Sequence, residues 1–401
     1  MIGYSIAFAT YLVLVFLIRR SLDVQESNPI VLTLSVGYWL RIVLSFFLRD
    51  IPFWSHGAGG DYAGYEYNAQ DILIYWHQHG LEYVTRDKLP TILESSLPAN
   101  IIALMSYLNG GYSRVAVEGL IAFCACMTCL MLYQLYIIYD PIRKISFRMM
   151  LFCLFGLTFL FYTSDLFKDA YVVFFVVGIF WASLRFIQAQ SVLPGILFCL
   201  CCFVGLWNVR HYMVYPVMPI FTLGILGISF TDGKSRAVWV MTVMAVGVSL
   251  MPMLYDLLHE NAEKTFEIAS SEAWHRGLQE GGSGVDLGEY QSSVFSWPIK
   301  VIYTLFAPFP WQGGSLGFQI AKVELLVWYY CYYQAFAGLL FLNRRNRYFA
   351  LAFLVFLVPA IFAYAVSFGN IGLIVRQRLP IMFVVSILAV WGMAQKPREI
   401  S

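Results

Sequence analysis

The sequence predicts an all-α, polytopic integral membrane protein, and composition together with the pattern of apolar runs supports that prediction. The mean hydropathy is +0.68, 60% of the residues are hydrophobic and only 12% are charged, which is unlike a soluble globular chain. Apolar runs long enough to cross a bilayer as helices recur along the chain. They are continuously apolar and do not alternate with a period of two, which favours helices over a barrel.

Eleven membrane-spanning helices are expected in a single transmembrane domain that covers residues 1–401. The expected spans are residues 4–18, 30–48, 115–138, 149–163, 170–184, 192–208, 213–230, 237–255, 320–342, 348–366 and 379–394. No charged segment precedes the first run and no small-residue cleavage signal follows it, so we interpret it as a retained helix.

The short connections rich in Lys and Arg lie on alternate sides of successive predicted spans. The positive-inside rule makes that side cytoplasmic, with the N-terminus outside and the C-terminus inside. The other side, the periplasmic or extracellular face of what would be a bacterial inner (plasma) membrane, then holds both long connections, residues 49–114 and 256–319. All six histidines also lie on that side. We expect interfacial amphipathic helices in the first long loop and a possible lid in the second.

Nothing in the sequence indicates a nucleotide, nucleic-acid or metal site. The net charge of +2 is close to neutral, and there is no Walker loop or Rossmann glycine fingerprint. All eight cysteines lie in apolar runs, where they pack as small hydrophobes. No metal site and no cofactor are predicted; a divalent cation is compatible with the chemistry below, but no residues support it.

The first long loop contains GGDYAGYEYNAQD, residues 59–71, in an otherwise apolar chain. Asp61, Tyr65, Ala69 and Trp76 recur at helical spacing, and HQHG is a plausible helix stop. This pattern predicts an interfacial helix with its aromatic residues at headgroup level and Asp61 at its start. The alternative role of Asp61 is to cap the helix. A second short helix is expected at residues 98–110.

Charged residues also border the apolar runs on the outer side. Asp165, Lys168 and Asp169 lie where the fourth expected span ends and the fifth begins, and Arg210 and His211 lie between two later spans. Charges at such depth are costly unless they are paired or face a wet cavity, so they are functional candidates, with a structural ion pair as the alternative. Arginine offers donors suited to phosphate oxygens, and histidine can move a proton.

Two further segments lie on the same side. FAPFPWQGG, residues 306–314, is a stiff aromatic turn that would either face substrate or re-enter the membrane. Arg376 and Arg378 precede the last span, and on a helix they would point about 200° apart, so that only one faces inward. If both arginines contact one anion, the backbone between them must be extended. The alternative is that at least one of them anchors the protein to lipid headgroups.

Outer carboxylates and arginines at the membrane boundary suit a reaction on a lipid-linked phosphate. A carboxylate can remove a proton from an acceptor hydroxyl while arginines neutralise the leaving phosphate. Two motifs resemble those of the GT-C glycosyltransferases. Asp61, Tyr65 and Ala69 match the D-x-x-x-Y-x-x-x-A pattern of their first outer loop, and KDAYVVFFVVGIFWASLR is similar to their second acidic motif. These polytopic enzymes include protein O-mannosyltransferases and aminoarabinose transferases.

The resemblance implies site residues one by one. Asp61 would be the catalytic base and Asp169 would lie in the same cavity. The run N-x-G-x-x-x-R-x-R from Asn370 resembles the donor-phosphate site, which implies Arg376 and Arg378. The predicted set is completed by Glu66 as an alternative catalytic acid, by Arg210 and Lys168 for the donor phosphate, and by Tyr65, His211, Trp311 and Asn370 for substrate.

The sequence departs from the class in two places. Two spans precede the first outer loop, whereas the class usually has one. The class also usually pairs the first acid with a second one, and here Tyr62 occupies that position. Glu66 and Asp71 therefore stay open as the base.

The predicted function is inverting transfer from a polyprenyl-(pyro)phosphate-linked sugar or oligosaccharide to a hydroxyl of a glycan or lipid-linked acceptor, in cell-surface polysaccharide assembly. The same layout fits O-antigen or exopolysaccharide polymerases. A lipid-linked glycan flippase is the alternative from another class, although no inverted repeat is visible and the charges gather at one boundary. A third possibility is acyl transfer on the outer face through His211, but no second histidine lies within a span to support it.

Overall fold

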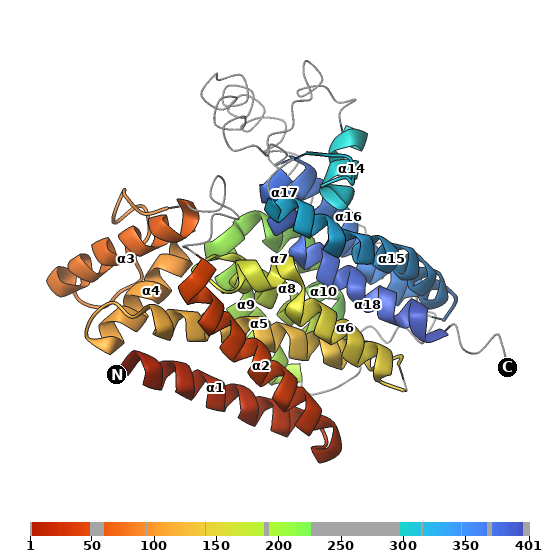
Figure 1. The fold of residues 1–401 in the computed structure, drawn as a ribbon, viewed down its shortest axis with the longest axis horizontal. Helices are drawn as coiled ribbons and strands as arrows, with labels where there is room; N and C mark the ends of the chain where they lie inside the picture. The colour runs from red at the N-terminus through yellow and green to blue at the C-terminus, as the bar shows by residue number, and fades with distance from the viewer. Residues whose placement is uncertain are drawn as a thin grey trace.

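The computed structural model is helical throughout the residues that it describes (Figure 1). Those residues are 2–48, 60–93, 95–140, 142–187, 192–225, 297–313, 316–345, 347–366 and 371–395. The expected span at 237–255, most of the second long loop, and His56, His259 and His275 lie outside them.

The first part of the chain contains α1 (Ile2–Ser21), α2 (Val24–Leu48), α3 (Gly60–His79), α4 (Ser96–Asn109), α5 (Arg114–Tyr136), α6 (Lys144–Phe155), α7 (Leu157–Tyr162), α8 (Asp169–Ile187), α9 (Val192–Arg210), a 3-10 turn η2 (His211–Met213) and α10 (Val214–Ile225). The last part contains α14 (Trp297–Phe306), α15 (Leu316–Arg345), α16 (Arg347–Val366), α17 (Ile371–Gln377) and α18 (Leu379–Gln395).

The protein is a helical membrane protein. Within the described ranges, the helical stretches long and apolar enough to cross a bilayer are Ile2–Ser21, Val24–Leu48, Arg114–Tyr136, Pro194–Thr222 and Ala321–Arg345. Phe349–Ala365 and Leu379–Gln395 are shorter apolar helices. Large apolar side chains are exposed on α1, α2 and α15, among them Phe8, Leu32 and Phe336. Such apolar faces suit contact with lipid. Lipid tails are as apolar as these side chains, so the hydrophobic effect does not drive their burial inside a bilayer.

The core lies around α5 and α18, which are buried along nearly their whole length. Helices α1, α2, α6 and α8 all contact α5. Helices α15 and α18 cross very closely, because a Cβ atom at Gly338 would lie 2.0 Å from the carbonyl oxygen of Leu388, and one at Gly392 would lie 2.1 Å from that of Gln334. Small residues permit this approach of two backbones.

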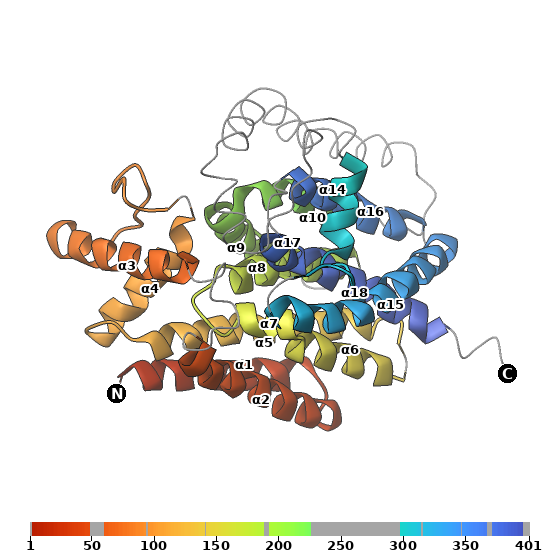
Figure 2. The same cartoon turned by 45° about the horizontal axis from the view of Figure 1, so that its top comes forward.

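Helices α3 and α4 pack on each other at one side of the bundle (Figures 1 and 2). Both predicted helices of the first long loop are confirmed: α3 ends at Gly80 with φ 88°, and α4 ends at Gly110 with φ 73°, the left-handed conformation that glycine tolerates. The prediction that the aromatic residues Tyr65 and Trp76 lie at headgroup level is wrong, since both are buried, as is Ala69 on the same face. The helical spacing of these residues therefore identifies the face of α3 that packs against other parts of the protein.

The expected span at 149–163 is also corrected. It starts earlier, at Lys144, and it is interrupted at Gly156, which separates α6 from α7. At Gly156 ψ is 128°, so the backbone leaves the helical conformation for one residue.

Candidate functional site

Asp169, Arg210 and Arg376 form a buried ionic cluster. Oδ1 of Asp169 lies 3.2 Å from Nη2 of Arg210, and Oδ2 lies 2.5 Å from Nε of Arg376. The three residues are 1%, 4% and 6% exposed, respectively. One carboxylate therefore faces two guanidinium groups away from bulk solvent. Arg210 donates a hydrogen bond to it, whereas the contact with Arg376 is an ion pair without hydrogen-bond geometry.

The cluster forms where three helix ends meet. Asp169 is the first residue of α8, Arg210 is the last of α9, and Arg376 lies in the last turn of α17. At Arg210 the backbone is extended, with φ −157° and ψ 77°, before the turn η2 begins. A carboxylate at the start of α8 also satisfies the positive end of that helix. The sequence prediction that Asp169, Arg210 and Arg376 serve one site therefore matches their observed proximity.

Aromatic rings connect Arg376 to α3. The Arg376 guanidinium lies 5.8 Å from the ring centroid of Tyr162 and 5.5 Å from that of Phe167. Phe167 in turn meets Tyr62 edge to face, at 6.3 Å between centroids. Tyr62 follows Asp61 in the first turn of α3, so two successive ring contacts connect the start of α3 with Arg376. The side chain of Asp61 lies outside the described part of the structure.

Arg210 has unused hydrogen-bonding capacity. Its Nη1 and the hydroxyl of Tyr212 are buried and have no hydrogen-bond partner among the described residues. The rings of Tyr212 and Tyr364 meet edge to face at 5.9 Å, and both hydroxyls lie near enough to act on the charge of Arg210. Buried donors without partners are rare in folded proteins, and an anion would satisfy them here.

Lys168 joins the first long loop to α9. Its Nζ donates to Oγ of Ser95 at 2.8 Å, and Ser95 Oγ donates to the carbonyl of Val209 at 2.9 Å. Val209 precedes Arg210, so Lys168 helps to place the end of α9.

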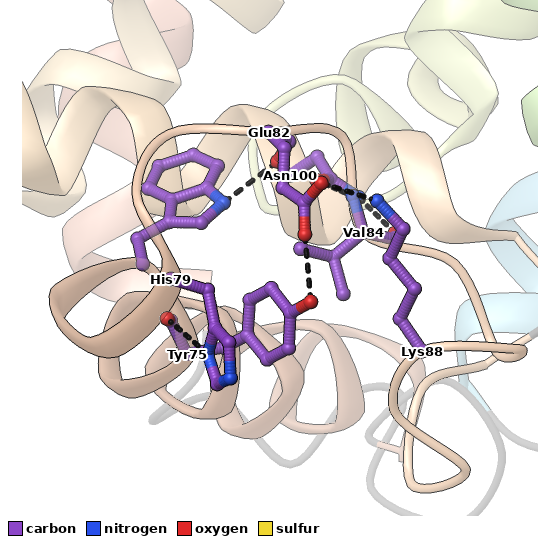
Figure 3. Close-up of polar contacts among 7 residues, drawn as sticks. Tyr75, His79, Glu82, Val84, Lys88 and Asn100 are labelled. Carbon is purple, nitrogen blue, oxygen red and sulfur yellow. Dashed lines mark hydrogen bonds and ion pairs between the residues drawn. The ribbon is translucent and has the colours of Figure 1, made fainter.

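The loop that contains Ser95 is fixed to the α3/α4 unit. Asn100 exchanges two hydrogen bonds with the backbone of Val84, at 3.0 and 2.8 Å, and Tyr75 donates to Glu82 at 2.6 Å (Figure 3). Hydrogen bonds from Lys88 and Tyr75 lower the pKa of Glu82, and the bond to Glu82 raises the pKa of Tyr75. The loop therefore has a defined path from α3 to Ser95.

Arg378 does not join the cluster. It lies in the turn between α17 and α18, and its Nη1 donates to the carbonyls of Ala307 and, at 3.4 Å, Leu305. The backbone at these arginines is helical, not extended, and the two side chains part, as expected for residues two apart on a helix. Both arginines are buried, which does not favour the alternative of lipid headgroup anchoring. Arg378 instead fixes the loop that follows α14.

The remaining predicted residues lie apart from Asp169. Glu66 accepts a hydrogen bond from the Tyr112 hydroxyl. His211 is exposed, with its ring 6.3 Å from that of Trp207. Trp311 is 79% exposed and stacks on Phe309 with centroids 4.9 Å apart. Tyr65 is buried, and Asn370 lies outside the described residues.

A second ionic group lies close in sequence but has other partners. Asp165 Oδ1 lies 3.4 Å from Nη2 of Arg114, whose Nε lies 3.5 Å from Oε1 of Glu118. Asp165 was expected to be paired or to face a cavity, and an ion pair is what is observed. Sequence reasoning missed three buried charged residues within apolar helices, Glu118, Arg41 and Glu324.

Within the described ranges, no group of three or more His, Cys, Asp or Glu residues is arranged to hold a metal ion. No family model matches the sequence, and neither a curated protein nor a solved structure matches it significantly. The argument for function therefore rests on the geometry of the Asp169 cluster and its surroundings.

Proposed function

We propose that the protein is a membrane glycosyltransferase of the GT-C type that takes its sugar from a polyprenyl-(pyro)phosphate carrier. The observation that supports this proposal is the cluster of Asp169, Arg210 and Arg376, in which two buried guanidinium groups face one carboxylate beside unsatisfied donors. A phosphate or pyrophosphate would accept hydrogen bonds from Arg210 Nη1 and from the Tyr212 hydroxyl, which have no partner among the described residues, and would attract both guanidinium groups.

The reaction would proceed by inversion. A carboxylate takes the proton of the acceptor hydroxyl, the oxygen attacks the anomeric carbon, and the bond from that carbon to the phosphate oxygen breaks. The leaving phosphate keeps the electron pair, and arginines stabilise its charge.

Asp61 is the proposed base, because the first turn of α3 reaches Arg376 through Tyr62 and Phe167. Asp169 has a different role. Both of its carboxylate oxygens face guanidinium groups, Oδ1 that of Arg210 and Oδ2 that of Arg376. Asp169 would instead hold Arg210 and Arg376 in place for the leaving group. Glu66 is less suited to the base, since it bonds Tyr112.

The proposed orientation places this cluster on the non-cytoplasmic face of a bacterial inner membrane, with eleven spans. In α8 the acidic end holds Asp169 and the opposite end holds Arg185. Basic residues also occupy the last turns of α1 and α15, namely Arg19, Arg20, Arg344 and Arg345. By the positive-inside rule these ends are cytoplasmic.

One observation favours the rival flippase function. Arg41 and Glu324 are charged residues buried within the apolar helices α2 and α15, and intramembrane charges often line a transport path. Both, however, bond to the backbone at a helix interruption, which gives them a structural role.

The deciding experiment uses purified protein in detergent, where movement across a bilayer does not exist. A polyprenyl-linked sugar and an acceptor should give a new glycosidic product. Asp61→Asn should abolish turnover while donor binding persists. The matched control is Glu82→Gln in the loop after the same helix, whose carboxylate accepts from Tyr75 at 2.6 Å.

Normal turnover of Asp61→Asn would remove Asp61 as the base, and Glu66→Gln would then test the alternative. No product with several lipid-linked donors would favour transport. A product that grows by repeat units would identify the enzyme as a polymerase.

A further inference from the structure

The interruption between α6 and α7 requires partners for its backbone groups. At Gly156 the helical hydrogen bonding stops, so carbonyls at the end of α6 and N–H groups at the start of α7 lose their intrahelical partners. These groups are buried within the bundle, where leaving one unpaired is costly.

Glu324 on α15 satisfies the start of α7. Its Oε2 accepts from the backbone N–H of Thr158 at 2.7 Å and from Oγ1 of Thr158 at 2.9 Å. Trp328 Nε1 donates to Oε1 at 3.2 Å. The site is tight, because a Cβ atom at Gly156 would lie 3.1 Å from Oε1 of Glu324. Glu324 therefore caps α7 from another helix.

Arg41 on α2 satisfies the other side of the interruption. Its Nη2 donates to the carbonyl of Leu154, near the end of α6, at 2.8 Å, and its Nε donates to Oγ1 of Thr163 at 2.7 Å. The guanidinium also lies 5.3 Å from the ring centroid of Phe159. Arg41 thus joins the end of α6 to the residue that follows α7.

Helix α7 is therefore held at both ends, and it contacts α17 directly. Its last residue, Tyr162, lies beneath the guanidinium of Arg376. Glu324 also lies near enough for its charge to act on Arg378, two residues after Arg376. A shift of α7 along its axis would displace the Tyr162 ring, and the guanidinium that rests on it would move too.

We propose that Glu324 is a positioning residue that, by capping α7, sets the position of the Arg376 guanidinium relative to Asp169. This inference rests on the proposed function only where it assigns Arg376 to the donor phosphate. Glu324 bonds Thr158 at the start of α7 and Trp328 on its own helix, so its effect on Arg376 passes through α7.

The first test needs no ligand. Hydrogen–deuterium exchange is measured on the full-length protein in detergent, for wild type, Glu324→Ala, Glu324→Gln and Glu26→Gln. Glu26 is the matched control, because it also accepts from two other elements, through Tyr133 and Arg143. In Glu324→Ala, peptides of α7 and α17 should exchange about tenfold faster, with α5 unchanged, because local opening is confined to the affected unit.

Glu324→Gln should show a smaller effect, since its amide oxygen can still accept from Thr158. Two results would overturn the proposal: faster exchange in α7 with α17 unchanged, or equally faster exchange in every helix, including α5. The same change in Glu26→Gln would assign the effect to general loosening.

The second test measures binding of farnesyl pyrophosphate, a short polyprenyl pyrophosphate, by calorimetry in detergent. Glu324→Ala should weaken binding about tenfold, because a misplaced contact group loses affinity steeply. In an Arg376→Ala background the same substitution should have no further effect, since a double-mutant cycle isolates the coupling between the two residues. Equal weakening in both backgrounds would contradict a route through Arg376.

The two proposals can fail separately. If Arg210→Ala and Arg376→Ala both leave the affinity for farnesyl pyrophosphate unchanged, the donor-site assignment fails. The exchange of α17 in Glu324→Ala would still decide whether Glu324 positions Arg376.

Discussion

Nε of Arg376 lies 2.5 Å from Oδ2 of Asp169, which joins the end of α17 to the start of α8. On its other oxygen, Asp169 holds Arg210 at 3.2 Å. Removal of the shared carboxylate would leave two buried guanidinium groups without their common counter-ion.

Asp169→Asn should therefore lower the free energy of unfolding by about 3–5 kcal/mol, the usual cost of an uncompensated buried charge. A second substitution, Arg376→Gln, removes one of the excess charges and should recover part of that loss. Thermal unfolding in detergent measures both effects, with Arg376→Gln alone as the control. Turnover should stay low in the double variant, and a double variant no more stable than Asp169→Asn would contradict this account of the cluster.

The two late arginines should have separate effects. Arg376→Ala should raise the KM for a polyprenyl-linked donor about tenfold, because a hydrogen bond to a charged group contributes roughly 1.5–3 kcal/mol. Arg378→Ala should leave that KM nearly unchanged and instead alter the fluorescence of Trp311, because Arg378 holds the carbonyl of Ala307 in the same loop. The sequence alone predicted a donor role for both, and a large KM effect of Arg378→Ala would restore that prediction.

The crossing of α15 and α18 should tolerate no side chain at Gly338. An added Cβ would lie 2.0 Å from the carbonyl oxygen of Leu388, so Gly338→Ala should destabilise the protein by about 1–3 kcal/mol, as overpacking does. Gly313→Ala is the matched control, since its Cβ would meet nothing within 4 Å. Equal unfolding temperatures of the two variants in detergent would show that the helices separate at little cost.

The loop after α3 should respond to acid through Glu82. Hydrogen bonds from Lys88 and Tyr75 lower the pKa of this carboxyl in the folded protein below its ordinary value of 4.5. A lowered pKa means that the bonds stabilise the fold above the ordinary pKa and that this contribution disappears as the pH falls through the folded value.

Proteolysis of residues 80–93 in wild type and Glu82→Gln can measure this effect. Wild type should resist cleavage better near pH 6, and the difference should shrink as the pH falls below 4.5 and through the lowered pKa of Glu82 in the folded protein. A difference that persists at acid pH would assign the protection to contacts other than the charge of Glu82.

Much of the helical architecture could be predicted from the sequence. Continuous apolar runs marked α1, α2, α5 and α8, and the glycines after His79 and Asn109 marked the ends of α3 and α4. The interruption at Gly156 could not be predicted from its own run, because the residues that satisfy it, Glu324 and Arg41, lie far away in the sequence.

For the site, the chain positions of Asp169, Arg210 and Arg376 at span ends predicted their common location. Their pairing was not predictable, since which of Arg376 and Arg378 faces Asp169 depends on the rotation of α17. The signal for Arg41 and Glu324 was present as single charges inside apolar runs, where burial of a charge demands a partner. Tyr65 and Trp76 were misplaced because helical spacing does not distinguish a membrane surface from the neighbouring α4.

The order of synthesis gives the ionic cluster a consequence for how the protein matures. Helices α8 and α9 leave the ribosome before α17, so Asp169 first meets Arg210 alone, and the early pair is neutral. Arg376 arrives near the end of translation and adds the second guanidinium. A nascent chain that stops before α17 thus holds the Asp169–Arg210 pair without Arg376, and the proposed phosphate-binding group is complete only once α17 has been synthesised.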